Sequence, residues 1–357
     1  MRKTIGIVLM ILMSSALVFA AGSGEKKGST TTGSKVYKIA LCNSYMGNDW
    51  RQEMEKTIQV VASKAPYKDR VTLSIVNTEN TAEAQAAAID DLTQKGYAAI
   101  LVDASSGTAL NPAIERAAAA SVVVVAFDQN VTSEKAWNVH TDFDVASKAW
   151  ATFLANALNG KGNIAFDRGL PGAPISEQIN TIAKGVFAKY PGIKIVGEFD
   201  GKYAEGEGQQ GMATVLAVNP KIDGVFSQNF SEPLIRAFTE AKRQVVPMTV
   251  FDTNGGMVAL AQSGAKGLVV NNIPGLGAIA MKLALSILDG ANPPKDYKVN
   301  PGLLSTDPSI DLGIPGVTAE KLEIGKNCFT DLPATLDWPV LPADFGVTVT
   351  PQELLAK

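Results

Sequence analysis

Short runs of apolar residues alternate with longer amphipathic segments along most of the chain, beginning near residue 36. The short runs have the length of buried strands, and the segments between them carry apolar residues at helical spacing. In the first half this pattern predicts strands at 37–42, 71–77, 98–103 and 122–127, with helices at 50–65, 82–95 and 112–120 between them. Strands that alternate with helices in this way are typical of βαβ units and a parallel sheet.

The same alternation resumes after Trp137 and predicts a second lobe. It comprises helices at 145–158, 175–189, 206–217 and 232–242, and strands at 163–166, 193–198, 224–227 and 248–251. A further strand at 267–273 and a helix at 276–288 follow it. We therefore expect an α/β protein with two similar, doubly wound lobes.

The last part of the chain follows a different pattern. A proline-rich stretch at 292–300 leads into residues 302–357, where periodicity is weak and further prolines exclude a long helix. This tail nevertheless carries apolar anchors, namely Phe329, Leu332, Trp338, Val340, Leu341 and Phe345. A disordered tail is poorer in such residues, so we expect residues 302–357 to be an ordered extension that wraps over the lobes.

The N-terminus has the layout of a secretory signal peptide. Arg2 and Lys3 precede an apolar run at 5–19, and small residues follow it at Ala20 and Ala21. The run is shorter than the roughly 20 residues of a membrane-spanning helix. We expect a signal peptide at 1–21, a flexible linker at 22–35 and a periplasmic or otherwise extracytoplasmic protein. An uncleaved anchor helix is the alternative.

Composition narrows the function classes. The chain has 357 residues and a net charge of -3, and its Lys and Arg residues are evenly spread. This distribution does not indicate a nucleic-acid-binding surface. With one histidine and two cysteines, neither a Cys/His zinc site nor a Ser-His-Asp hydrolase is expected. We expect no metal and no cofactor. His140 is expected to be structural and Cys42 to be buried and free, although pairing with Cys328 stays open.

Polar residues follow nearly every predicted strand, at the edge where ligands bind in open parallel sheets. They are Asn43 and Ser44, Asp128 and Gln129, Gln228 and Asn229, Asp252, and Asn271 and Asn272. Carboxylates, which only accept, and two-sided amides can together satisfy the donor and acceptor of each sugar hydroxyl. Trp50 and Tyr203 are candidates to cover the apolar face of a sugar. The alternative is that these polar residues only cap helices and make turns.

At these strand ends the sequence resembles the ribose- and glucose-type periplasmic binding proteins, the sugar-binding subunits of ABC importers. The likeness is carried by residues 43–44 with 47–51 (Gly-Asn-Asp-Trp-Arg), 77–82, 112–117, 125–128 (Val-Ala-Phe-Asp), 169–172, 190–192, 226–229 and 251–252, and it covers roughly 36–301. It implies two Rossmann-like lobes, one of residues 36–141 with 273–301 and one of residues 142–272. Three chain crossings, near 142, 252–272 and 301, would form a hinge between the lobes.

The resemblance also implies ligand contacts. It assigns Asn48, Asp49, Trp50 and Arg51 to the first loop, Asp128 to the acid that accepts from sugar hydroxyls, Tyr203 to the aromatic position of the second lobe, and Asn229, Asp252 and Asn272 to further polar contacts. Two departures stand out. Gln129 stands where the family usually has an arginine directly after the acid. Asn180, with Gln178 nearby, stands where the family usually has an arginine on the helix that follows residues 169–172. Losing both bidentate donors should change the preferred hydroxyl pattern, unless Arg51 or Arg168 compensates.

We therefore expect a monomeric solute-binding protein, not an enzyme, that captures a small polar ligand between its lobes and delivers it to an ABC permease. A monosaccharide is the expected ligand, and an autoinducer, polyol or small cyclic amide is the alternative. A sensor for chemotaxis or two-component signalling would have the same sequence features. A transcription regulator would need a helix-turn-helix where the signal peptide lies, and a glycosidase would need Asp128 and Asp252 as its carboxylate pair.

Overall fold

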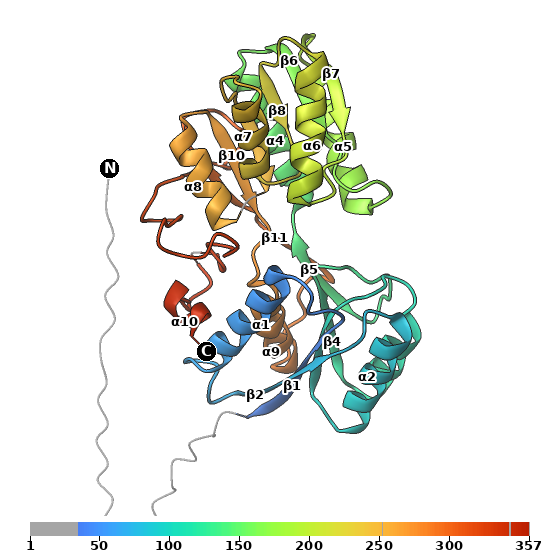
Figure 1. Ribbon diagram of the computed structural model, residues 1–357. Coiled ribbons are helices and arrows are strands. Elements are labelled where there is room, and N and C mark those ends of the chain that lie inside the picture. The colour runs from blue at the N-terminus through green and yellow to red at the C-terminus, as the bar shows by residue number, and fades with distance from the viewer. Residues whose placement is uncertain (1–34, 252, 343, 357) are drawn as a thin grey trace, which may run out of the picture. The chain divides into compact units, whose positions relative to one another are not determined.

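The computed structural model describes residues 35–251, 253–342 and 344–356. Within them the chain forms two β-sheets, each flanked by helices (Figure 1). The expected signal peptide, all but the last residue of the expected linker, and Asp252 lie outside the described residues.

The first lobe is built on a parallel six-stranded sheet with the order β11-β5-β4-β3-β1-β2. Its strands are β1 (Tyr37–Asn43), β2 (Val71–Asn77), β3 (Ala99–Asp103), β4 (Val123–Phe127), β5 (Trp137–Thr141) and β11 (Asp296–Val299). Its helices are α1 (Asp49–Ala62), α2 (Ala82–Gln94), α3 (Asn111–Ala119) and α9 (Leu276–Leu288).

Helices cover both faces of the first sheet. Successive residues of a strand point to opposite sides, so they pack against different helices. Ile39 and Leu41 of β1 pack in the core with α1 and α9. Ala40 and Cys42 pack on the other face with α2 and α3. Cys42 is fully buried with a free thiol, and burial raises the pKa of this thiol to about 12. Because residues on both faces of β1 are buried, its sequence is a continuous apolar run from Ile39 to Cys42.

The second lobe is built on a seven-stranded sheet with the order β13-β12-β10-β9-β8-β6-β7. Its strands are β6 (Lys161–Asp167), β7 (Gly192–Phe199), β8 (Gly224–Phe226), β9 (Met248–Phe251), β10 (Gly267–Asn271), β12 (Gly302–Ser305) and β13 (Glu320–Lys321). The helices are α4 (Phe143–Ala157), α5 (Pro174–Phe187), α6 (Glu205–Val218), α7 (Ser231–Glu240) and α8 (Asn254–Ser263). Strands β6 to β10 are parallel, whereas β12 pairs antiparallel with β10.

The expected fold of two α/β lobes is confirmed, but several elements were not predicted. The first sheet has six strands rather than four, because β5 and β11 belong to it. Both are polar, and β11 is an edge strand with three exposed residues, so neither gives an apolar run. Helix α8 was missed because Gly255 and Gly256 lie in its first turn, where they lower helix propensity.

The chain passes between the two sheets three times. It leaves the first sheet after β5, returns from β10 to α9 and β11, and leaves again between β11 and β12. His140 helps to join β5 to β11, because its Nε2 lies 2.6 Å from an oxygen of Asp296. His140 has the hydrogen-bonded environment of a structural residue.

The tail, which we define as residues 302–342 and 344–356, contacts both lobes. Its apolar residues Leu336, Val340 and Phe345 are buried in the core that also contains residues of α1 and α9. A side chain on Gly275, just before α9, would collide with the backbone carbonyl of Val340, so the tail passes directly over this point. At its end, α10 (Pro351–Leu355) lies beside α1 (Figure 1).

Specific polar contacts fix the tail at both lobes. Asn254, at the start of α8, donates through Nδ2 to the carbonyl of Phe329 at 2.8 Å. On the first lobe, Lys64 pairs with Glu353 at 2.6 Å and Lys282 donates to the carbonyl of Phe345. The tail therefore connects the two lobes outside the three chain crossings.

None of the helices in the described part of the chain is long and apolar enough to span a bilayer.

Candidate functional site

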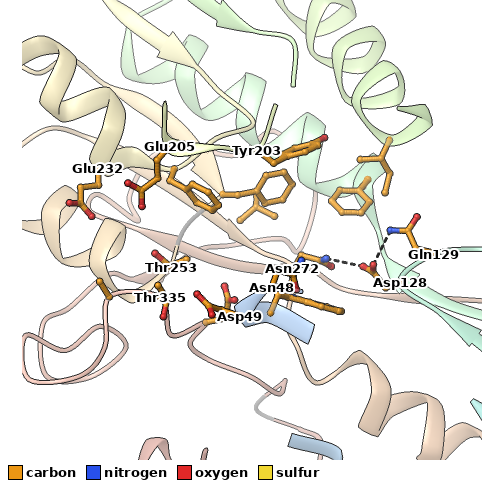
Figure 2. Close-up of a pocket in the computed structure, with 18 residues that line it drawn as sticks. Asn48, Asp49, Asp128, Gln129, Tyr203, Glu205, Glu232, Thr253, Asn272 and Thr335 are labelled. Carbon is orange, nitrogen blue, oxygen red and sulfur yellow. Dashed lines mark hydrogen bonds between the residues drawn. The ribbon is translucent and has the colours of Figure 1, made fainter. Parts of the chain in front are cut away.

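A cavity of about 480 Å³ is bounded by residues of both lobes and of the tail. Its volume lies within the roughly 300–1,000 Å³ that is usual for small-molecule sites. The lining residues are Asn48, Asp49, Trp50, Asp128, Gln129, Phe143, Ile175, Tyr203, Glu205, Phe230, Glu232, Phe251, Thr253, Val270, Asn272, Ala334, Thr335 and Asp337. Figure 2 shows Tyr203, Glu205 and Glu232 on one side of the cavity and the labelled first-lobe residues on the other.

The first turn of α1 places three residues at the cavity. Asn48 is the N-cap, and its Oδ1 accepts from the backbone N–H of Arg51 at 2.9 Å. The next two residues, Asp49 and Trp50, line the cavity. The indole N–H of Trp50 donates to the carbonyl of Asn272 at 2.7 Å, which fixes the ring against the crossing after β10. Helix capping and this hydrogen bond together set the position of the ring.

Asp128 follows β4 and is held by two amides. Asn272 Nδ2 donates to its Oδ1 at 3.0 Å, and Gln129 Nε2 donates to its Oδ2 at 2.9 Å (Figure 2). Thr141 Oγ1 in turn donates to Asn272 Oδ1 at 2.6 Å, so residues from two chain crossings orient the acid. Asp128 has a φ of 58°, which Asp adopts more easily than most residues. Each carboxylate oxygen keeps a lone pair for a ligand hydroxyl.

Tyr203 provides the aromatic surface of the second lobe. Its hydroxyl lies 2.6 Å from Ser176 Oγ and donates to Gln228 Oε1 at 3.0 Å. Burial raises the pKa of this phenol. Tyr203 and the preceding Lys202 both have positive φ values, of 56° and 53°, and such a conformation in a bulky residue is often found at functional sites. Its ring packs edge-on near Phe251, with centroids 6.2 Å apart.

Two predicted ligand contacts lie behind Tyr203 rather than at the cavity wall. Asn229 is fully buried and donates to the carbonyls of Gly201 and Ala204, both at 2.8 Å. Asn180 accepts from Gln228, the residue that accepts from the Tyr203 hydroxyl. Asn229 and Asn180 thus hold the turn that carries the ring, and a direct contact with a ligand remains a prediction for both.

Two further predicted residues are engaged elsewhere. Gln178 donates to Asp144 at 2.9 Å on the surface of the second lobe. Arg51 Nη1 lies 2.8 Å from Asp103 and donates to Asn43 at 2.6 Å, so its guanidinium faces the interior. Asp103 is fully buried; burial, and next the charge of Asp128, raise its pKa, while Arg51 opposes this shift. Arg51 therefore anchors α1. Its guanidinium does not take the place of the arginine that usually follows the acid in the family.

Arg168, the other candidate, pairs with Asp200 at 2.8 Å and does not line the cavity.

The structure adds cavity residues that the sequence did not single out. Apolar additions are Phe143, Ile175, Phe230, Phe251 and Val270, and polar additions are Glu205, Glu232, Thr253, Thr335 and Asp337. Phe251 and Val270 lie near the predicted strand ends, and that position could have identified them. Glu205 lies in an acidic stretch with Glu207 at the start of α6, which is also typical of a solvated helix end. Asp337 follows no predicted strand, so nothing in the local sequence pattern indicated it.

The cavity combines acceptor carboxylates, amides and aromatic faces, which suits reversible binding of a small polar molecule. Within the part of the chain that the structure describes, no group of three or more His, Cys, Asp or Glu residues has the arrangement of a metal site.

Known proteins resemble the chain in both sequence and structure. A xylitol-binding protein of Mycolicibacterium smegmatis is 28% identical over 256 residues, covering 69% of this chain and 71% of that protein. The ribose import binding protein of Bacillus subtilis is 25% identical over 298 residues, covering 81% and 94%.

Among solved structures, an ABC transporter periplasmic solute binding protein of Actinobacillus succinogenes with bound D-allose has a TM-score of 0.64. It is 24% identical and covers 75% of this chain and 96% of its own. At that identity the likeness supports the fold. The family described as periplasmic binding protein domain matches residues 39–292, most of the two lobes. The expected resemblance is therefore confirmed, and this chain belongs to the periplasmic binding protein domain family.

Proposed function

We propose that this protein is the extracytoplasmic solute-binding component of an ABC importer and that it captures a small polyhydroxylated ligand between its lobes. One observation carries the proposal. Asp128, held by the amides of Gln129 and Asn272, lies in the same cavity as the aromatic rings of Trp50 and Tyr203. Such a combination matches the hydroxyls and the apolar face of a sugar or polyol.

The relatives support the same ligand class. The two curated relatives described above are named for xylitol and for ribose import, and both align over more than two thirds of this chain. A pentitol and a pentose share a dense arrangement of hydroxyls on a short carbon chain. We therefore place monosaccharides and polyols first among the candidate ligands.

In the proposed mechanism, the lobe of residues 36–141 with 273–301 closes on the lobe of residues 142–272. The ligand bonds to Asp128 and Trp50 on one side and contacts Tyr203 on the other. Closure is then a population shift, because the ligand makes more contacts in the closed state. The closed form would present its surface to a membrane permease, and no bond of the ligand is broken.

A ligand screen tests this function. The purified protein is examined by native mass spectrometry for copurified small molecules, and a thermal-shift panel of pentoses, hexoses and polyols follows. A micromolar binder present at 100 times its Kd should stabilise the folded protein by about 2.7 kcal/mol. A panel in which no sugar or polyol raises the unfolding temperature, with no small molecule copurifying, would contradict the proposal.

Binding alone does not separate capture from catalysis. Recovery of the bound compound unchanged after long incubation is expected of a binding protein. The appearance of a hydrolysis product from a glycoside would indicate an enzyme instead.

A further inference from the structure

The charged side chains that line the cavity all carry the same sign of charge, which is negative. The described residues that line it include five acids and no Lys, Arg or His. The acids are Asp49, Asp128, Glu205, Glu232 and Asp337. They come from both lobes and from the tail. A neutral sugar requires hydroxyl acceptors but not this much negative charge.

The five acids differ in how their charge is compensated. Glu205 and Glu232 both pair with Arg236, each at 3.0 Å. Asp128 receives two amide donors. The carboxylates of Asp49 and Asp337 have neither an ion pair nor a hydrogen-bond donor among the described residues. The uncompensated charge is therefore concentrated where α1 meets the tail.

A third acid lies behind them in the same region. Glu53 is only 9% exposed; its Oε2 accepts from the backbone N–H of Asp337 at 2.9 Å, and its Oε1 has no partner in the part of the chain that the structure describes. The nearby cations are engaged elsewhere, because Arg51 faces Asp103 and Lys56 donates to the carbonyl of Ala356 at 2.7 Å. Burial without a cation favours the neutral form of a carboxyl group, and a bound positive charge would favour its ionised form.

The directions of the pKa shifts agree with this geometry. Burial, and next the charge of Asp49, raise the pKa of Asp337 to about 7. Burial, followed by the charge of Asp337, raises the pKa of Glu53 to about 9. Both shifts have the direction that a cationic ligand would reverse.

We propose that this end of the cavity, formed by Asp49 and Asp337, binds a protonated amine on the ligand, so that the preferred ligands are amino sugars or amino polyols. The inference rests on the proposed function, since the hydroxyls of the same ligand bind at Asp128. An ammonium group has three donors and no acceptor, which matches two carboxylates that lack donors.

Closure of the lobes strengthens the argument. Figure 2 shows Glu205 and Glu232 across the cavity from Asp49 and Thr335. Moving these sides together without a ligand would bring like charges closer, and the single Arg236 is already shared by two glutamates. An ammonium between them would make closure favourable, and the aromatic rings that line the cavity add attraction for a cation.

The test compares ligands that differ only in the amine. Glucose is paired with glucosamine, galactose with galactosamine, and sorbitol with glucamine, and isothermal titration measures each at low salt. We expect the amine of at least one pair to bind about tenfold more tightly than its neutral partner, as one charge-assisted contact allows. Raising the salt concentration should reduce this difference, because screening weakens it.

Asp337→Asn removes the charge but keeps the shape. It should lower the affinity for the amine about tenfold and change the affinity for the neutral partner less than about twofold. Asp331→Asn, at an exposed acid of the same tail that does not line the cavity, is the matched control and should change neither. If Asp337→Asn folds poorly, Asp49→Asn at the exposed first turn of α1 gives the same comparison.

The outcomes separate this inference from the proposed function. Neutral sugars that bind as tightly as their amines overturn the inference and leave the proposed function standing. A larger stabilisation by calcium or magnesium chloride than by any amine overturns it too, because the charge would then serve an inorganic cation. If neither the neutral ligands nor their amines bind, the proposed function and this inference both fail.

Discussion

The two ends of the ligand cavity are both acidic but are built differently. At the hinge end, which we define as Asp128 with Gln129 and Asn272, each carboxylate oxygen already receives an amide donor. At the tail end, defined as Asp49 and Asp337, the carboxylates have no donor among the described residues. The hinge end is organised before a ligand arrives, whereas no cation of the described residues pairs with the tail end.

Under the proposed function, the same kind of side chain serves two kinds of recognition. An oriented carboxylate with free lone pairs discriminates hydroxyl positions, because its direction is fixed by neighbouring amides. A carboxylate crowded by other acids discriminates charge, because any cation relieves the repulsion whatever its exact direction. We expect the hinge end to set affinity for all ligands and the tail end to set the preference for amines.

The largest effect is expected from Asp128→Ala. Each hydrogen bond from a hydroxyl to this carboxylate contributes about 1.5–3 kcal/mol, so losing two should weaken binding at least about 100-fold. Because neutral and amine ligands share the hydroxyls, isothermal titration should show similar losses for both. The unliganded unfolding temperature should change little, since Asp128 is only half-buried. An amine that still binds normally would show that the two ends are independent sites.

A smaller effect is expected from pH, and only on amines. The pKa of Asp337 is raised to about 7, so this acid is mostly protonated at pH 6 and ionised at pH 8. A bound ammonium favours the ionised form, and the affinity for glucamine should therefore rise by up to about tenfold from pH 6 to pH 8. Sorbitol should show no such rise, and Asp337→Asn should abolish it.

The groups that face Asp337 support this assignment of the pH effect. Asp49 and Glu53 approach it from α1, whereas Glu205 and Glu232, paired with Arg236, line the same cavity from the second lobe. Glu53 has a pKa raised to about 9 and stays protonated across most of this range. A glucamine affinity that falls between pH 6 and pH 8 would contradict the role of Asp337.

The smallest effect is expected from Gln129→Ala. Gln129 is exposed and gives Asp128 one amide donor, so its loss should weaken binding about threefold, in line with roughly 0.5–1.5 kcal/mol for a typical hydrogen bond. The change should be equal for sorbitol and glucamine. Asn130→Ala, at the next exposed residue, is the control. A selective loss of glucamine binding would show that Gln129 belongs functionally to the tail end.

The sequence predicted the hinge end better than the tail end for a physical reason. Asp128 and Asn272 lie directly after apolar strands, and the ends of parallel strands converge at one edge of a sheet. Trp50 and Tyr203 could be proposed because the family resemblance assigns aromatic or stacking roles to their positions. The sequence pattern therefore reports positions that the sheet itself brings together.

Residues placed by loops or by long-range packing could not be predicted in this way. Asp337 reaches the cavity only because the tail is held by buried Leu336 and Val340 and by the backbone bond to Glu53. Asn229 was predicted as a ligand contact from its strand end, yet its amide holds the Tyr203 turn. Strand position alone does not indicate the direction of a side chain.

The course of the tail has a consequence for how much of this chain can stand alone. The family match ends at residue 292, yet Leu336, Val340, Leu341 and Phe345 cover apolar surface near α1 and α9. Trimming the gene to the recognisable family region would uncover this surface and invite aggregation. Exchanging only the part of the tail that follows β13, in contrast, offers a route to change one wall of the cavity while both sheets stay intact.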